Sequence, residues 1–144
     1  MKQIEKNGMK VSWAFEGEQL KVEVVAPTKG WVAIGFNEQD QLVGHHLIMG
    51  KVVGDQIYVS DRYIRGIGQH YAVTELGGIS HLSQPSGQED SGGTQIRFHI
   101  ATSPKDAFHY TLEKGQTIHL LIAYSQSDDF EHHSAMRSAL TITL

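Results

Sequence analysis

Two pairs of adjacent histidines are the residues of this chain best suited to chemistry. His45 and His46 open an apolar run, and His132 and His133 stand in the closing stretch SDDFEHHSAMRSALTITL, shortly before Arg137. Imidazole nitrogens bind transition metals and heme iron. The pairs therefore predict a metal or heme-iron site. Exposed polar loops are the structural alternative.

The geometry of a strand limits what each pair can offer, because neighbouring side chains point to opposite faces. Each pair supplies one ligand rather than two, and a Zn²⁺ or Cu²⁺ site would need a carboxylate such as Asp128 or Glu131. The chain has nine histidines and no cysteine. Disulfides, thiolate nucleophiles and cysteine zinc sites are thus excluded.

Composition and charge exclude further classes of protein. The chain has 144 residues, of which 40% are hydrophobic and 19% charged, and its net charge is −4. This predicts a single domain over residues 1–144 without the basic patch that nucleic acid requires. No apolar run reaches the roughly 20 residues that insert into a membrane, and MKQIEKNGMKVSW lacks a signal-peptide segment.

No carboxylate pair has a catalytic spacing, so we expect a binding domain rather than an enzyme.

Short alternating runs separated by Gly, Asn and Asp predict an all-β fold. We expect eight or nine strands in an antiparallel, immunoglobulin-like β-sandwich. Residues 77–93 form the longest irregular stretch in this interpretation, and residues 103–115 hold at most a turn or two of helix. The predicted strands lie in MKVSWAFEG, EQLKVEVVAP, GWVAIGFN, HHLIMGKVV, DQIYVSDRYI, TQIRFHIAT, TIHLLIAYS and SALTITL.

Five segments, in chain order, resemble motifs of the DOMON family of β-sandwich domains. They are GWVAIGFN, LVGHHLIMGKV, VSDRYIRG, GGTQIRFHI and LLIAYSQSDDFEHHSAMRSALTITL, and the resemblance covers about residues 8–144. It implies a sandwich that binds heme or a sugar, mostly on the extracytoplasmic side. Heme-binding members act in electron transfer beside a redox domain or a membrane cytochrome.

The resemblance also implies where heme ligands would lie. In several members the iron is held by a Met in the second motif and a His near the last strand. Here His133 stands at the His position and Leu42, which has no donor atom, at the Met position. His46 is the leading second donor, because period-two geometry gives it the same face as Leu42. His70 and Met49 are alternatives, although Met49 has the opposite parity and is of a type that usually fills cores.

The leading hypothesis is a non-catalytic b-type heme domain for electron transfer or heme-dependent sensing, with a redox protein as partner. The alternatives are a module that binds a sugar or another small ligand without heme, and an interaction domain that has lost the pocket. In the heme hypothesis, His46 and His133 are the axial ligands, Leu42, Ile48 and Phe130 line the slot, and Arg137 lies beside a propionate.

Other residues have structural interpretations. Asp61 and Arg62 predict a carboxylate–guanidinium pair that anchors a turn. Trp13 and Trp31 occupy strand positions and are expected in the core. His109 is expected to be a surface or hydrogen-bonded residue, as are His99 and His119.

Overall fold

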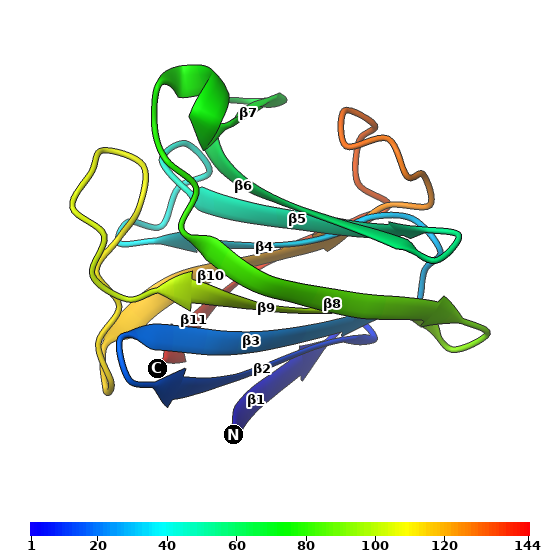
Figure 1. Ribbon diagram of the computed structural model, residues 1–144, viewed down its shortest axis with the longest axis horizontal. Coiled ribbons are helices and arrows are strands. Elements are labelled where there is room, and N and C mark those ends of the chain that lie inside the picture. Colours follow the sequence, from blue (N-terminus) through cyan, green and yellow to red (C-terminus); the bar gives the residue numbers. More distant parts are fainter.

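The computed structural model describes residues 1–144 and is a sandwich of two antiparallel sheets (Figure 1). This confirms the predicted all-β class. The five-stranded sheet has the order β1 (Lys2–Lys6), β2 (Met9–Glu16), β3 (Gln19–Ala26), β9 (Gly93–Ala101) and β8 (Leu82–Asp90). The six-stranded sheet has the order β11 (Met136–Thr143), β10 (Thr117–Tyr124), β4 (Val32–Asn37), β5 (His46–Val53), β6 (Gln56–Gly66) and β7 (Gln69–Ala72).

Alternating sequences form the strands that face the main core on one side only. In β9, the buried residues Ile96, Phe98 and Ile100 alternate with half-buried polar residues. Such alternation is typical of an antiparallel sheet with one solvated face. The main core between the sheets buries 21 residues, which come from both sheets, from the loop between β9 and β10, and from the chain end.

The central strands of the six-stranded sheet depart from this alternation. All six residues of β4 and the first five of β5 are buried. A second apolar group, here named the outer cluster, covers the face that points away from the main core. It consists of Trp31, Ala33, Leu47, Met49, Ile64, Leu121 and Ala123, with Leu42 and Phe130 packed against it.

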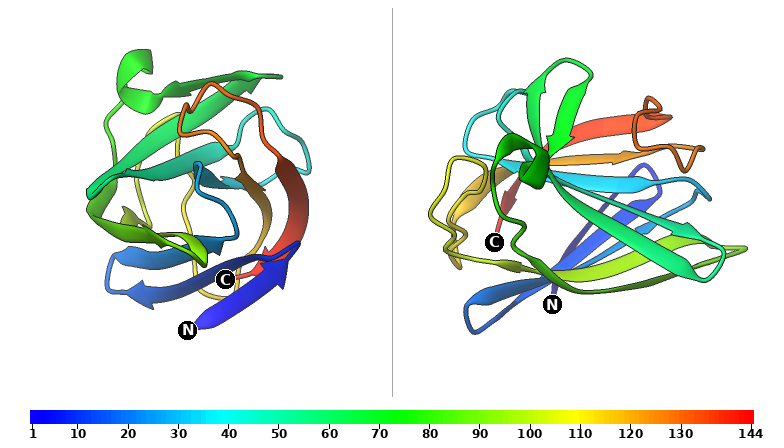
Figure 2. Two further views of the ribbon diagram at one scale, coloured as in Figure 1. Left: turned by 90° about the vertical axis from the view of Figure 1, so that its right-hand side faces the viewer. Right: turned by 45° about the horizontal axis from the view of Figure 1, so that its top comes forward.

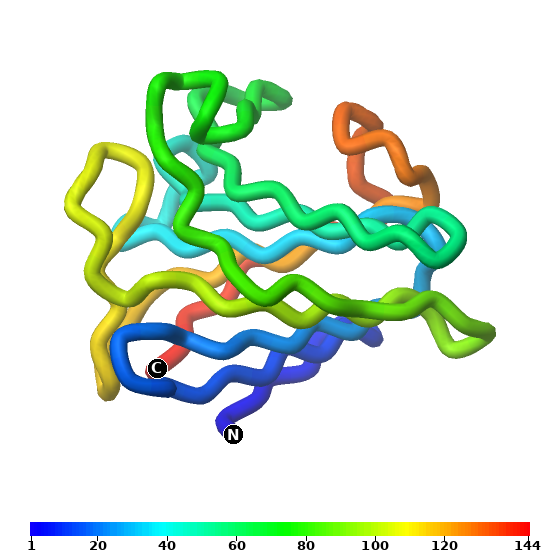
Figure 3. Tube along the Cα trace, in the orientation of Figure 1, coloured from blue at the N-terminus to red at the C-terminus, as the bar shows by residue number.

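One end of the sandwich is closed by two irregular segments. A 3₁₀ turn, η1 (Val73–Leu76), follows β7, and the chain then descends through residues 77–81 to the other sheet (Figure 3). Residues 102–116 form a loop at the same end, drawn in yellow at the left of Figure 1. Both segments contribute side chains to a buried polar cluster described below.

The structure has eleven strands, more than the sequence patterns predict. Three strands, β1, β7 and β8, lie outside the predicted segments, and β8 falls within residues 77–93, which we expected to be irregular. Its sequence, LSQPSGQED, has no apolar alternation, because β8 is an edge strand with mostly exposed side chains. Pro85 falls where the register with β9 shifts between Ser83 and Ser86, a position at which the ladder does not need its missing N–H. Residues 103–115 form no helix.

Candidate functional site

A pocket lies over the outer cluster, on the face of the six-stranded sheet that is remote from the main core. Strand register sets its floor. Ala33 pairs with Met49 on one side and with Ala123 on the other, and Ala123 pairs with Arg137. These four residues therefore form one row across four strands. The two alanines keep the middle of the floor low, between longer side chains at its ends.

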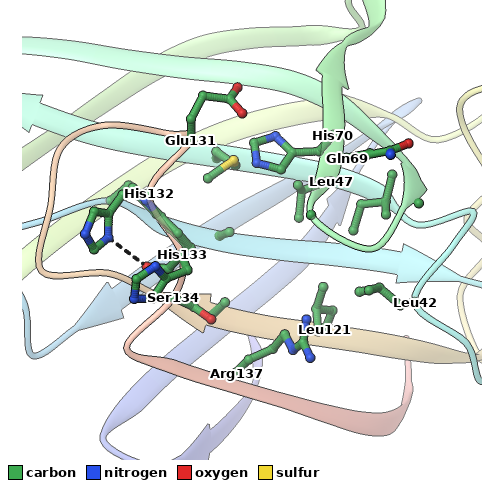
Figure 4. Close-up of a pocket in the computed structure, with 17 residues that line it drawn as sticks. Leu42, Leu47, Gln69, His70, Leu121, Glu131, His132, His133, Ser134 and Arg137 are labelled. Carbon is green, nitrogen blue, oxygen red and sulfur yellow. Dashed lines mark hydrogen bonds between the residues drawn. The ribbon is translucent and has the colours of Figure 1, made fainter.

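Two loops form the rim of the pocket. The tip of the β6–β7 hairpin contributes Gly66, Gly68 and Gln69. Residues 125–135, here named the histidine loop, contribute Glu131 to Ser134 (Figure 4). Figure 2 shows both loops on the same side of the six-stranded sheet. The cavity has a volume of about 190 Å³, below the roughly 300–1,000 Å³ of most ligand pockets. A large ligand would therefore remain partly exposed at the rim.

The sheet fixes the histidine loop by backbone and cationic contacts. The Trp31 N–H donates to the Ser127 carbonyl at 3.0 Å, and the Ser125 N–H donates to the Trp31 carbonyl at 3.0 Å. Lys51 Nζ donates to the Asp128 carbonyl at 2.9 Å and lies 4.4 Å from the centre of the Phe130 ring. The position of the two histidines is thus set by β5 and by the chain entering β4.

The histidine loop presents two imidazoles at the pocket. The rings of His132 and His133 are stacked, with centroids 4.5 Å apart. His132 Nδ1 lies 3.0 Å from the His133 carbonyl, so this nitrogen carries a proton and Nε2 keeps a lone pair. The ring of His133 makes no hydrogen bond within the protein. Both residues line the pocket and could ligate a metal or heme iron.

His70 also lines the pocket, but its lone pair is already used. Arg62 Nε donates to His70 Nδ1 at 2.9 Å. Because guanidinium nitrogens only donate, the proton of a neutral His70 must be on Nε2, the nitrogen that would otherwise ligate. Burial lowers the pKa of His70, and the charge of Arg62 lowers it further.

The predicted ion pair between Asp61 and Arg62 is wrong. The two residues are neighbours in β6 and point to opposite faces. Arg62 is on the outer face, where its guanidinium contacts Glu131 Oε1 at 3.3 Å and His70. Asp61 is on the inner face and is 4% exposed. Arg62 therefore links the two rim loops instead of anchoring a turn through Asp61.

Of the predicted site residues, the structure brings Leu42, His133 and Arg137 to the pocket and packs Phe130 against the outer cluster. It does not bring the other two there. His46 and Ile48 point to the inner face of β5, where Ile48 belongs to the main core. His46 Nε2 lies 2.7 Å from Asp61 Oδ1. The reason is parity: β5 turns Leu47 and Met49, not His46 and Ile48, toward the pocket.

The inner polar cluster is centred on the Asp61 carboxylate. Its second oxygen accepts from His109 Nε2 at 2.7 Å and from the His81 N–H at 2.9 Å. His109 Nδ1 lies 2.8 Å from the Asp106 carboxylate, and His81 Nε2 lies 3.2 Å from it. The inner polar cluster thus consists of Asp61, His109, His81, Asp106 and His46. These five residues join β5 and β6 to the two segments that close this end of the sandwich.

Hydrogen bonding, rather than burial, sets the charges of this cluster. Burial alone would raise the pKa of Asp61, but hydrogen bonds from His109 and His46 hold that pKa well below its ordinary value. Burial alone would lower the pKa of His109, yet bonds to Asp61 and Asp106 outweigh it and raise that pKa. Burial lowers the pKa of His46. Asp61 is therefore ionised and His46 neutral at pH 7.

One pocket residue was not anticipated at this site, and another was expected mainly in the core. Trp31, expected in the core between the sheets, belongs to the outer cluster, and its indole Nε1 is buried without a partner. Met49 forms part of the floor. The unbroken apolar runs of GWVAIGFN and HHLIMG were the available signal, since a strand that is apolar on both faces needs a cover on each side.

This fold and pocket define a β-sandwich domain with a partly apolar pocket on one outer face. The model of the DOMON domain family matches residues 5–125, so the chain belongs to the DOMON family. MOXD1 homolog 2 of Drosophila melanogaster is 26% identical over 119 residues, which are 83% of this chain and 15% of that protein. The chain thus spans only a small part of that relative.

Two solved structures have a similar fold. The cytochrome b domain of pyranose dehydrogenase from Coprinopsis cinerea has a TM-score of 0.74 and 11% identity, covering 98% of this chain and 80% of that one. The cytochrome domain of Myriococcum thermophilum cellobiose dehydrogenase has a TM-score of 0.71 and 12% identity, covering 99% and 80%. At these identities the likeness concerns the fold. No helix of the structure has the length and hydropathy to cross a bilayer.

Proposed function

We propose that this domain binds a b-type heme in the pocket over the outer cluster and serves electron transfer or heme-dependent sensing. The observation that carries the proposal is an apolar sheet face outside the main core, overhung by the free imidazole of His133. Heme needs an apolar site with axial donors. The two solved structures that share this fold are cytochrome domains, which supports the same ligand.

The residues present fit the group. His133 offers a ring nitrogen from the rim, and Met49 offers a thioether from the floor. Met49 takes the role first expected of His46, whose Nε2 is bonded to Asp61 on the other face of β5. Arg137 makes no ion pair, and the Trp31 indole N–H has no partner. Both donors suit a propionate. Bound heme would supply one-electron chemistry, and a Met/His pair raises its reduction potential.

The protein's own part is to hold the rim and keep water from the floor. Arg62 bonds to both rim loops, through His70 on one side and Glu131 on the other. The apolar floor lowers the local dielectric, which strengthens electrostatic contacts made there. A redox partner would dock at this rim. The family resemblance supports an extracytoplasmic location, which fractionation of cells that make the native protein would test.

A small polar ligand, such as a sugar, is the second candidate. The small cavity favours it, as do the polar rim residues Gln69, Glu131 and Arg137. Leu42, at the position where the family resemblance places a Met ligand, also favours it, because it has no donor. In this case the protein is colourless and a sugar raises its melting temperature by mass action.

A hemin titration followed by absorption spectroscopy separates these functions. We expect a low-spin Soret spectrum that saturates at one heme per chain. His133→Ala should lose this spectrum, whereas the matched control His99→Ala should keep it, since His99 lies in β9 of the five-stranded sheet, away from the pocket. If hemin fails to bind at stoichiometric concentration, the heme proposal is wrong, and stabilisation by sugars becomes the measurement to make.

A further inference from the structure

The inner polar cluster gathers the ligating atoms of two imidazoles and a carboxylate in a buried space. The donor atoms of His46, Asp61 and His109 all lie within 4.8 Å of one another. Their side chains are 4%, 1% and 1% exposed. Burying three ionisable groups costs free energy unless they are paired or bind a metal. Tying two loops to a sandwich could be done by uncharged hydrogen bonds.

The contacts divide these residues into ligands and supports. His109 directs Nε2 to the centre of the cluster and bonds through Nδ1 to the Asp106 carboxylate at 2.8 Å. Histidines that bind metals commonly donate their other ring N–H to a carboxylate in this way. The Asp61 carboxylate is held by the His81 N–H at 2.9 Å. His109 and Asp61 are thus already oriented by a second set of groups.

We propose that His46 Nε2, Asp61 and His109 Nε2 bind a divalent transition-metal ion of the Zn²⁺ type, with Asp106 and His81 as positioning residues. Two imidazoles and one carboxylate, with a fourth position left for water, are a ligand set that Zn²⁺ accepts. The ion replaces the protons now shared between the two Nε2 atoms and the carboxylate. This site is separate from the heme pocket, because it lies on the other face of the sheet.

The distances allow the ion after a small adjustment. Ligand atoms about 2.0–2.2 Å from a tetrahedral Zn²⁺ are roughly 3.3 Å apart. The present N···O separations are 2.7 Å, so each pair must open by roughly 0.6 Å. Entry is from the end of the sandwich, where the side chains of His81 and Asp106 are 30% and 23% exposed.

The test is a titration of chelator-treated protein with Zn²⁺, and with Co²⁺ as a spectroscopic probe. We expect one ion per chain, Co²⁺ absorption bands of four-coordinate type, and a melting temperature about 5–10 °C higher at free Zn²⁺ near 100 times Kd. His46→Gln should abolish binding, and Asp106→Asn should weaken it roughly 10–100-fold. Circular dichroism confirms that each variant is folded.

The control is His99→Ala, which removes a histidine from the solvent side of β9 and should leave the titration unchanged. Asp106→Asn keeps the test valid if His46→Gln fails to fold, because Asp106 is partly exposed. Two results overturn the proposal. One is the absence of stoichiometric binding to the wild-type protein. The other is binding that survives both His46→Gln and Asp106→Asn, which would place the ion on surface histidines.

Discussion

His46 and Met49 stand three residues apart in β5 and point to opposite faces of the same sheet. His46 bonds to Asp61 inside the sandwich, whereas Met49 forms part of the floor of the outer pocket. One strand therefore contributes to both the outer pocket and the inner polar cluster, so a substitution can be directed at one without altering the side chains of the other.

The first prediction concerns the heme-loaded protein. Met49→Leu keeps the side-chain volume nearly constant but removes the thioether, so we expect the iron to lose its low-spin spectrum and its reduction potential to fall. His46→Gln should leave the spectrum unchanged. Absorption spectra of the oxidised and reduced forms make the comparison. A normal spectrum in Met49→Leu together with an altered one in His46→Gln would reverse the assignment of the second axial ligand.

The second prediction concerns the stability of metal-free protein. Asp61→Asn removes a buried carboxylate that accepts three hydrogen bonds. Since breaking a buried charged network is costly, we expect the free energy of unfolding at pH 7 to fall by about 2–4 kcal/mol. Urea denaturation in the presence of chelator measures it. Glu23→Gln, in the partly exposed pair with Arg97, is the control and should cost less than about 1 kcal/mol.

The third prediction is a pH dependence at the rim. Burial, and then the charge of Arg62, lower the pKa of His70 in the folded protein. The neutral form therefore stabilises the fold fully above the unfolded pKa of about 6.5, and this stabilisation is lost as the pH falls toward the folded pKa. The carboxylate of Glu131 opposes the shift but is outweighed.

His70→Asn tests this dependence, because the Asn carbonyl can still accept from Arg62 Nε without taking up a proton. Between pH 7 and 5, the wild-type protein should lose stability more steeply than the variant. One proton limits the difference to about 1.4 kcal/mol per pH unit, and partial exposure reduces it further. Equal slopes in denaturation series would show that His70 titrates normally.

The fourth prediction concerns a close backbone approach beside the pocket. A Cβ on Gly30 would lie 2.2 Å from the Ser125 carbonyl oxygen and 2.6 Å from the backbone of Gln126. Gly30→Ala must therefore push the histidine loop away from the chain entering β4. We expect a loss of about 1–3 kcal/mol in stability and weaker hemin binding. Gly92→Ala, which meets only the Asp90 side chain at 3.1 Å, should have little effect on either quantity.

Alternation was sufficient to predict the strands with one solvated face, as in TQIRFHIAT. It could not predict β8, whose Ser, Gln and Gly residues are exposed on an edge. It could not decide the face of β5 either. The period of two residues places His46 and Met49 on opposite faces of the strand. Because HLIMG is buried on both faces, nothing in the strand itself indicates which face points to the main core.

The two sites were predictable to different degrees. The family resemblance and the heme hypothesis singled out His133, Leu42 and Arg137, and all three line the pocket. The inner cluster depends on His81, Asp106 and His109, which lie in irregular segments far from His46 in sequence. No spacing rule connects such residues, because loop conformation and sandwich closure decide where they meet. Only the pairing of His46 with the strand of Asp61 was implied by the hairpin between residues 46 and 66.

The most direct measurement is a crystal structure of the protein reconstituted with hemin. We expect heme over the outer cluster, with iron bound by His133 Nε2 and Met49 Sδ and a propionate near Arg137. If iron were bound by His132, the axial histidine would be the neighbouring residue, and heme would still occupy the same pocket. Heme on the inner face at His46, or a crystal grown with excess hemin that holds none in this pocket, would contradict the central claim.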